Sequence, residues 1–359
     1  AERGLSPAQI GIALAAWSAT GLVLEIPAGV LADRTSRRGL LFAGQALRAL
    51  GLLVWLLAPG FWGYLTGLMM WGLKSALLSG TFEALVYDEL AAEGRSADYA
   101  RTMGRAHAAR WAGFLAASLI AAWAVRLGYE ALIVASVAAG ALSAASAIAL
   151  PQAPRARAVD APHYLGQLAR GLADARRLPG VLPLMLFIAA MMALVTACED
   201  YWQIFGKQVG LPPFAIGLFV AALGGVSAIA SGLAHRGRDL GMSLLFGLVA
   251  AAGLLILAAA GVFRPWATAL VLAYIALARV LEVNFDARFQ HRLAPETRAT
   301  VASLKGFLTQ GGNTLLILTF GLAAQAGTYR AAFIAFGAAL AVLGAAAGAM
   351  AVARRRRSA

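Results

Sequence analysis

The sequence predicts an all-α integral membrane protein, and three observations support that fold class. Of the 359 residues, 61% are hydrophobic and 13% are charged, whereas a soluble domain carries about 25% charged residues. Apolar runs long enough to cross a bilayer as a helix, roughly 20 residues, recur from one end of the chain to the other. Strands of a membrane barrel would be about half that length and would alternate in polarity, so these runs predict helices.

Eleven apolar spans can be placed along the chain. Many of them are rich in Gly and Ala, which lets helices approach closely where lipid supplies no hydrophobic drive between them. The spans cover approximately residues 8–31, 39–58, 61–85, 102–125, 129–150, 181–205, 213–234, 242–262, 266–289, 301–324 and 331–352.

Basic residues collect in alternate gaps between the spans, from the arginines near residue 37 to the tail at 354–357. Because basic residues favour the cytoplasmic side of a membrane, we expect a multi-pass protein of a bacterial cytoplasmic membrane with its C-terminus in the cytoplasm. The same alternation places Ala1 outside. We therefore expect a further span ahead of Ala1, so that eleven transmembrane helices are visible of an expected twelve.

Composition also excludes several classes of function. The net charge of +13 does not indicate nucleic-acid binding, because the basic residues lie in the gaps between spans and not on one soluble module. The single cysteine, Cys198, excludes disulfides, and the four histidines lack metal-ligand spacing. The sequence has no Gly-rich phosphate loop and no clustered His, Asp and Ser near a span end. We expect no cofactor, no metal and no enzymatic activity.

A long gap divides the chain into two halves. The predicted parts are an N-terminal bundle at 1–150, a cytoplasmic linker at 151–180, a six-helix bundle at 181–353 and a basic tail at 354–359. Within the linker, Leu165, Leu168 and Leu172 have helical spacing, which predicts an amphipathic helix lying on the membrane surface.

The two halves also resemble each other weakly. Residues 26–34 are echoed by residues 229–236, and Glu83–Asp88 is echoed by Glu282–Asp286 at a similar offset. Parallel repeats of six helices are an architecture of transporters that work by alternating access. The pattern therefore predicts two pseudo-symmetric six-helix bundles.

The run Gly29-Val-Leu-Ala-Asp33-Arg34-Thr-Ser-Arg37-Arg38 lies in the short basic loop after the first visible span. It resembles the loop signature of the major facilitator superfamily, G-x-L-A-D-R-x-G-R-R, of a bacterial type. Ser36 stands where the family usually has Gly, which puts the turn geometry in question. The resemblance implies the fold of that family and transport by alternating access.

The resemblance also implies that Asp33 and Arg37 lock the cytoplasmic faces of the two halves together. Asp88, at the cytoplasmic end of the third span, is the natural partner for Arg34 or Arg37. The predicted conformational latch comprises Gly29, Asp33, Arg34, Arg37, Arg38 and Asp88.

Ionised side chains inside spans are costly and usually face one another or a cavity. From depth along the helices we expect three pairs, which either hold helices in register or serve coupling and substrate binding. These pairs are Glu25 with Arg48, Glu83 with Arg110, and Arg279 with Glu282.

Proton coupling requires a carboxyl group that titrates near working pH, and Glu25, Glu83 and Glu282 are the best candidates. Glu199 and Asp200 lie near an outer span end, where an interfacial role is favoured over a gate or substrate contact. Lys74 lies near mid-span and pairs either with an acid or with an anionic group. Asn284, Gln310 and Asn313 either hydrogen-bond a solute or join helices.

The predicted function is secondary active transport by alternating access, with proton-coupled efflux of small organic compounds as the leading form. The alternatives are a symporter for nutrient uptake and a non-transporting membrane sensor of the same fold. The predicted partners are a small-molecule substrate, H+ as coupling ion and the lipid bilayer, and the protein is expected to be a monomer.

Overall fold

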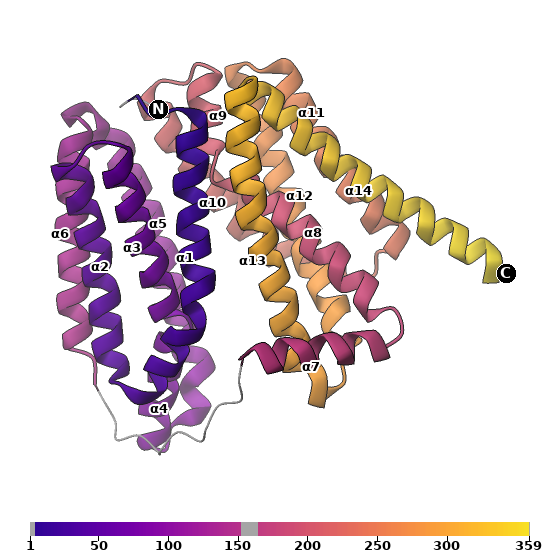
Figure 1. Ribbon diagram of the computed structural model, residues 1–359, viewed down its shortest axis with the longest axis horizontal. Helices are drawn as coiled ribbons and strands as arrows, with labels where there is room; N and C mark the ends of the chain where they lie inside the picture. Colours follow the sequence, from indigo (N-terminus) through magenta and orange to yellow (C-terminus); the bar gives the residue numbers. More distant parts are fainter. Residues whose placement is uncertain (1–3, 152–163, 359) are drawn as a thin grey trace. The chain divides into compact units, whose positions relative to one another are not determined.

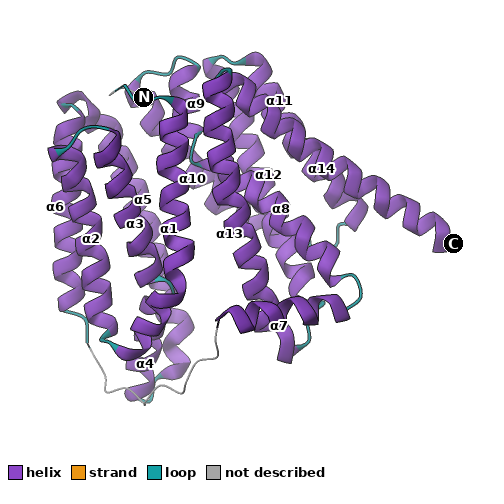
Figure 2. Ribbon diagram, viewed as in Figure 1, coloured by secondary structure: helices purple, strands orange, loops and turns teal. Residues whose placement is uncertain are grey.

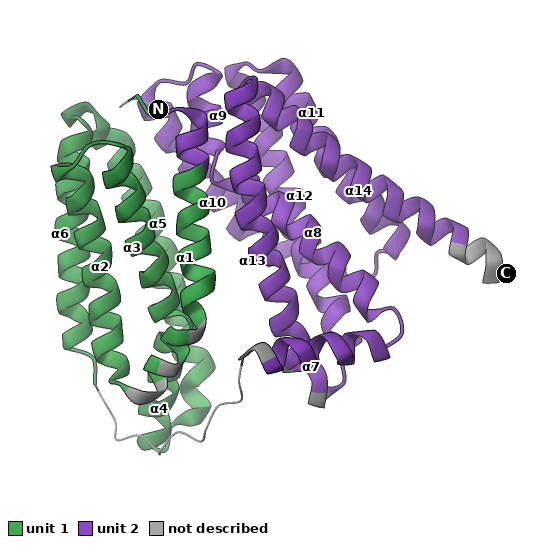
Figure 3. Cartoon of the chain, in the orientation of Figure 1, with its two compact units in different colours: residues 1–5, 12–164 green, residues 6–11, 165–359 purple. Residues whose placement is uncertain are grey.

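The computed structural model describes residues 4–151 and 164–358, with the side chains of Asp33, Arg34 and a few other helical residues left undescribed. All regular structure in these residues is helical (Figure 2). The chain forms two compact units: unit 1 comprises residues 1–5 and 12–164, and unit 2 comprises residues 6–11 and 165–359 (Figure 3). The main division, between Tyr164 and Leu165, falls inside the range 151–180.

The helices of unit 1 follow one another through short turns (Figure 1). They are α1 (Pro7–Arg34), α2 (Arg37–Leu57), α3 (Phe61–Leu78), α4 (Thr81–Ala92), η1 (Ser96–Asp98), α5 (Tyr99–Ala124), η2 (Val125–Leu127) and α6 (Tyr129–Ile148). α2 packs mainly against α3 and α6.

Unit 2 contains the two longest helices of the described residues, α13 and α14, with 32 and 30 residues. Its elements are α7 (Tyr164–Arg177), α8 (Val181–Glu199), α9 (Trp202–Gln208), α10 (Pro213–Leu233), η3 (Ala234–Gly237), α11 (Met242–Val262), η4 (Pro265–Ala267), α12 (Thr268–Gln290), α13 (Pro295–Ala326) and α14 (Tyr329–Ser358). α11 packs closely on α14, and α8 packs on α13.

Each expected span coincides with a helix, but two of the expected spans are interrupted. The span at 61–85 stops at Leu78 and resumes as α4 after Gly80, whose φ of 66° lies in the left-handed region. The span at 181–205 ends at Glu199, and α9 begins at Trp202. Among the described residues, ten helices are long and apolar enough to cross a membrane; α3, with 18 residues including Lys74, is not one of them.

The helix predicted in the linker forms as α7, and one side of it packs on α13. α7 runs across one end of unit 2 (Figure 1) and packs on α13. A Cβ on Gly171 would lie 2.6 Å from the carbonyl oxygen of Thr300, and Thr300 donates a hydrogen bond to Asp174. The helix is thus present and its Gly171 side contacts α13, while its position on the membrane surface stays a prediction.

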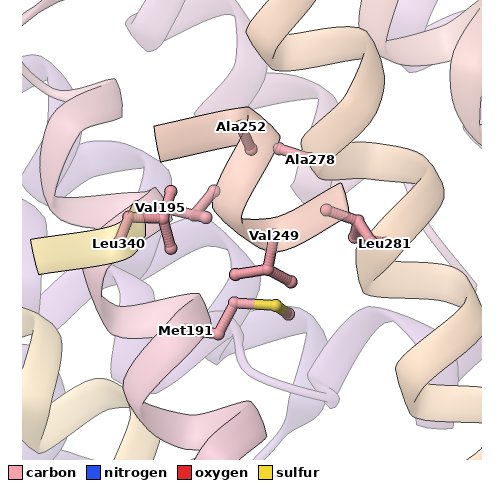
Figure 4. Close-up of a pocket in the computed structure, with 7 residues that line it drawn as sticks. All are labelled: Met191, Val195, Val249, Ala252, Ala278, Leu281 and Leu340. Atoms are coloured by element: carbon pink, nitrogen blue, oxygen red, sulfur yellow. The ribbon is translucent and has the colours of Figure 1, made fainter. Parts of the chain in front are cut away.

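The interior of unit 2 is dry around α8, α11, α12 and α14. A small gap between these helices has no room for a water molecule (Figure 4). It is lined by Met191, Val195, Val249, Ala252, Ala278, Leu281 and Leu340. The lining is entirely apolar, so this gap is a packing feature and not a site for a polar ligand.

Candidate functional site

The basic loop of unit 1 is a tight helix-to-helix turn. Ser36 is the N-cap of α2, and its Oγ accepts a hydrogen bond of 3.0 Å from the amide of Gly39. Ser36 has φ −65°, so this turn does not need the glycine that the family usually has there. Serine is instead favoured, since its side chain satisfies one of the unpaired amides at the helix start.

Two arginines fix this loop to the rest of unit 1. Arg37 forms an ion pair with Asp88 on α4, and Arg38 donates a hydrogen bond of 3.3 Å to the carbonyl oxygen of Leu150 after α6. The expected partnership of Asp88 with an arginine of the motif is thus confirmed for Arg37. The side chains of Asp33 and Arg34 lie outside the described part of the chain. Gly29 has open space where a Cβ would lie, so packing does not require glycine there.

Two of the three ion pairs expected inside the spans do not form between described residues. Glu25 accepts a hydrogen bond of 3.5 Å from the hydroxyl of Ser79, while Arg48 lies with its guanidinium 5.8 Å from the centre of the Trp71 ring. The pair was predicted because Glu25 and Arg48 lie at equal depth along their helices. Equal depth does not determine which side of a helix a residue is on. α2 packs mainly on α3 and α6, whereas Glu25 lies on α1.

The second expected pair, Glu83 with Arg110, fails for a different reason. The break at Gly80 places Glu83 in the first turn of the separate helix α4, where the helix dipole favours a carboxylate. Arg110 on α5 is exposed, and its guanidinium lies 5.3 Å from the centre of the Trp111 ring. A continuous span was the basis of the prediction, and that span is interrupted.

The third expected pair forms and gains a partner from another helix. Arg279 on α12 makes an ion pair of 2.6 Å with Glu282, one turn further along the same helix, and a second ion pair with Glu199 at the end of α8. The side chain of Arg279 is 20% exposed, that of Glu199 is 29% exposed and that of Glu282 is 39% exposed. We call these three residues the acidic triad, because two carboxylates share one guanidinium.

Further titratable groups surround the acidic triad. Asp200 follows Glu199 just beyond the span, and burial raises the pKa of its carboxyl to about 6. On α12, the hydroxyl of Tyr274 is buried without a hydrogen-bond partner, as is the indole nitrogen of Trp202 on α9. The hydroxyl of Tyr201 donates a hydrogen bond of 2.8 Å to the carbonyl oxygen of Ile317, which ties the break between α8 and α9 to α13.

Sequence reasoning placed Glu199 near an interface and did not connect it with Arg279. The two residues come from different helices far apart in the chain, and only the packing of α8 on α12 brings them together. The available signal was indirect: Glu199 and Asp200 are adjacent acids at the end of a strongly apolar span. Such acids require a cation or a proton.

The polar residues on the late spans mainly join elements of unit 2. The amide of Asn284 donates hydrogen bonds of 2.9 Å to the carbonyl oxygens of Ala234 and Val280. Asn313 accepts one of 3.0 Å from the hydroxyl of Thr196. Both amides are buried, which favours the helix-joining alternative for them, and Gln310 is exposed on α13.

Unit 2 has its own basic contacts at the corresponding ends of its helices. Lys305 on α13 forms an ion pair with Asp286 on α12. The guanidinium of Arg288 donates hydrogen bonds of 2.9 and 2.6 Å to the carbonyl oxygens of Arg238 and Leu240 in the turn after η3. No group of three His, Cys, Asp or Glu side chains that could hold a metal ion occurs among the residues with described positions.

Two helical units with ten candidate spans define a multi-pass α-helical membrane protein. A family model described as Major Facilitator Superfamily matches residues 1–314. The chain belongs to the major facilitator superfamily, and is thus a transporter of the secondary kind that acts on small molecules, not an enzyme. The predicted family is confirmed.

A relative from Escherichia coli (strain K12), the inner membrane transport protein YajR, is 35% identical over 88 residues. This match covers 24% of the present chain and 19% of YajR, so it joins a small part of each protein.

Several solved transporters share the fold over nearly the whole chain. The nucleoside transporter NupG matches with a TM-score of 0.81 at 14% identity, over 97% of this chain and 91% of its own. A bacterial homolog of the human lysosomal transporter Spinster gives 0.72 at 16% identity, over 97% and 89%. A D-xylose-proton symporter gives 0.68 at 13% identity, over 95% and 89%. The predicted all-α, two-bundle fold class is confirmed.

Proposed function

We propose that this protein is a proton-coupled exporter of small organic compounds that works by alternating access. The observation that supports proton coupling most directly is the acidic triad, in which Arg279 lies between Glu199 and Glu282. Two carboxylates and one guanidinium carry a net charge of −1 when all three are ionised.

That excess charge has a physical consequence in a membrane span. Ionised groups at this depth are costly unless they are compensated, so binding one proton to either carboxyl of the triad removes an uncompensated charge. Arg279 then holds the carboxylate that remains ionised. Uptake and release of a proton therefore change which partner Arg279 holds, and Arg279 bridges α8 and α12. Protonation of a triad carboxyl would therefore change how α8 and α12 pack against each other.

Export is the direction that we propose, because the spans are mostly apolar and suit amphipathic compounds. Uptake is the alternative, and one fold relative is a D-xylose-proton symporter. Transport into inside-out vesicles with an acidic lumen distinguishes export from uptake. A proton-coupled exporter accumulates its substrate in these vesicles. A proton-coupled importer does not.

The ion pair of Arg37 with Asp88 supports a second part of the proposal. We propose that Gly29, Asp33, Arg34, Arg37, Arg38 and Asp88 act as a conformational latch, and that the Arg37–Asp88 pair positions its loop. The arginine-rich gaps support a bacterial cytoplasmic membrane with the C-terminus in the cytoplasm. A monomer is the proposed working form.

The decisive experiment does not require the substrate to be known. Infrared difference spectra of the purified protein in proteoliposomes, recorded between pH 5 and pH 9, report protonated carboxyl groups. We expect Glu199→Gln and Glu282→Gln each to remove part of this signal and to abolish proton-driven transport in a screen of organic compounds. Glu93→Gln is the matched control, since Glu93 pairs with Arg95 on an exposed surface.

The control variant should keep the wild-type spectrum and activity. A wild-type spectrum in the double variant of Glu199 and Glu282 would contradict the proposal that the acidic triad binds the coupling proton. Transport that is insensitive to a proton gradient would contradict coupling itself.

A further inference from the structure

Several positively charged side chains on long helices of unit 1 have no acidic partner among the described residues, among them Arg48, Lys74 and Arg110. Two of these, Arg48 and Lys74, lie on the neighbouring helices α2 and α3. Arg48 lies about 16 Å along α2 from its start at Arg37, and Lys74 lies about 20 Å along α3 from Phe61, at about 1.5 Å per residue. Lys74 lies one turn beyond Trp71 on α3, and the Arg48 guanidinium lies over the Trp71 ring. Neither cation belongs to an ion pair with any described residue.

Glycines let α2 and α3, the helices that carry Arg48 and Lys74, pack closely. A Cβ on Gly51 would lie 2.9 Å from the carbonyl oxygen of Gly67, and a Cβ on Gly67 would lie 2.2 Å from the indole nitrogen of Trp55. The side chain of Lys74 passes Gly44, where a Cβ would lie 3.7 Å from its Cγ. α2 and α3 can approach this closely only because these positions lack side chains.

An aromatic wall adjoins the two cations. The Trp71 ring lies 5.8 Å from the Arg48 guanidinium, and its indole nitrogen donates a hydrogen bond of 3.3 Å to the carbonyl oxygen of Arg48. Trp55 lies 5.0 Å from Trp71 and 5.8 Å from Tyr64, centre to centre. The indole nitrogen of Trp55 is buried and has no hydrogen-bond partner.

We propose that Arg48 and Lys74, with Trp71 and Trp55 beside them, form a binding site for an anionic group, either a carboxylate or a phosphate. An anion supplies the counter-charge that the helices do not provide. A guanidinium binds a carboxylate or phosphate through two parallel hydrogen bonds, and an ammonium adds a point charge.

The site has the accessibility that a ligand needs. Arg48 is exposed and Lys74 is partly buried, so the charged groups are not sealed within the packing of α2 on α3. The rings offer an apolar surface to the rest of the ligand. These features fit an organic anion, and assigning the transported solute to this class rests on the proposed transport function, whereas anion binding itself does not.

Titration calorimetry of the full chain in a non-ionic detergent tests the site, with benzoate and inorganic phosphate as anions and benzamide as the neutral isostere of benzoate. We expect benzoate and phosphate to bind and benzamide not to bind. Lys74→Gln and Arg48→Gln should each weaken benzoate binding about tenfold or more. Lys74→Arg should restore it, and Arg264→Gln, an exposed control, should leave it unchanged.

A second readout separates binding from a structural role. Because Lys74 and Arg48 carry like charges on neighbouring helices, Lys74→Gln should melt at a higher temperature than the wild type when no anion is present. A purely structural lysine would give a lower melting temperature. Equal benzoate affinity in the wild type and Lys74→Gln, no binding of either anion by the wild type, or equal binding of benzamide overturns the site.

Lipid headgroups are the other source of the same chemistry, and nanodiscs distinguish them. If phosphatidylglycerol discs abolish the benzoate binding seen in phosphatidylcholine discs, the ligand is a headgroup and the assignment to the solute fails. We expect binding to persist in both. Failure of the proton proposal is separable, because Glu282→Gln should keep benzoate affinity and Lys74→Gln should keep the infrared signal.

Discussion

The two units hold ionised side chains within their spans in opposite balance. Unit 1 places Arg48 and Lys74 on neighbouring helices without a described acidic partner, whereas unit 2 gathers Glu199 and Glu282 around Arg279. The first arrangement has an excess of positive charge and the second an excess of negative charge. Each excess is costly in a membrane, and we propose that a different small species compensates each, an anion in unit 1 and a proton in unit 2.

The largest expected effect comes from removing the only cation of the acidic triad. Arg279→Gln leaves two neighbouring carboxylates with no cation between them, so it removes two ion pairs and adds a repulsion. The loss of one partly exposed pair, by contrast, costs less than about 1 kcal/mol. We expect transport to be lost and the melting temperature to fall sharply at pH 8. Adding Glu199→Gln should restore much of the stability but not the transport. Single and double variants that melt alike would contradict the triad.

Asp200 adds a further negative charge to unit 2 and makes the stability of the folded chain depend on pH. Its pKa is raised from 3.8 to about 6 by burial, so the folded chain binds this proton more tightly than the unfolded chain. The resulting stability is present below about pH 4 and is lost as the pH rises through about 6; at pH 8 the carboxylate costs up to about 3 kcal/mol.

Asp200→Asn should therefore raise the melting temperature at pH 8 and leave it unchanged at pH 4. The matched control is Asp239→Asn, because Asp239 is 87% exposed. A stabilisation by Asp200→Asn of equal size at both pH values would rule out titration as its cause.

A carboxylate placed beside Arg48 should remove the excess of positive charge that distinguishes unit 1 from unit 2. Gln45 lies one helical turn before Arg48, and its side-chain oxygen is buried without a partner. Gln45→Glu should raise the melting temperature in the absence of anions, because a new ion pair adds up to about 1 kcal/mol to the free energy of unfolding. It should also weaken benzoate binding by competing for the same cations. Gln45→Met, which adds no charge, should leave benzoate binding intact.

The smallest effect on stability is expected where charges are balanced one to one. The side chains of Arg37 and Asp88 are 21% and 36% exposed, and a pair of this kind contributes less than about 1 kcal/mol. Asp88→Asn should thus hardly change the melting temperature, yet it should slow transport because the pair positions the latch loop. Loss of folding as large as in Arg279→Gln would contradict this contrast.

The sequence predicted the fold class, the family and the contacts whose geometry is local. Arg279 and Glu282 are one turn apart on one helix, and Arg37 and Asp88 were expected at the same side of the membrane, so spacing and topology were sufficient. The pairing of Glu25 with Arg48 could not be predicted in the same way, because the neighbouring helices determine how each helix is rotated about its axis. The second ion pair of Arg279, with Glu199, depends on where α8 ends, and the continuous apolar run did not show that end.

The glycines between α2 and α3 also affect how genetic data on this protein should be read. Gly51 and Gly67 touch no ligand in our proposal, yet any side chain there would push the tryptophan rings aside. Substitutions at these positions would thus mimic a defect in substrate recognition. In a mutational scan, intolerance at a glycine of this interface would report on the spacing between two helices, even though it maps next to the residues that we propose bind the anion.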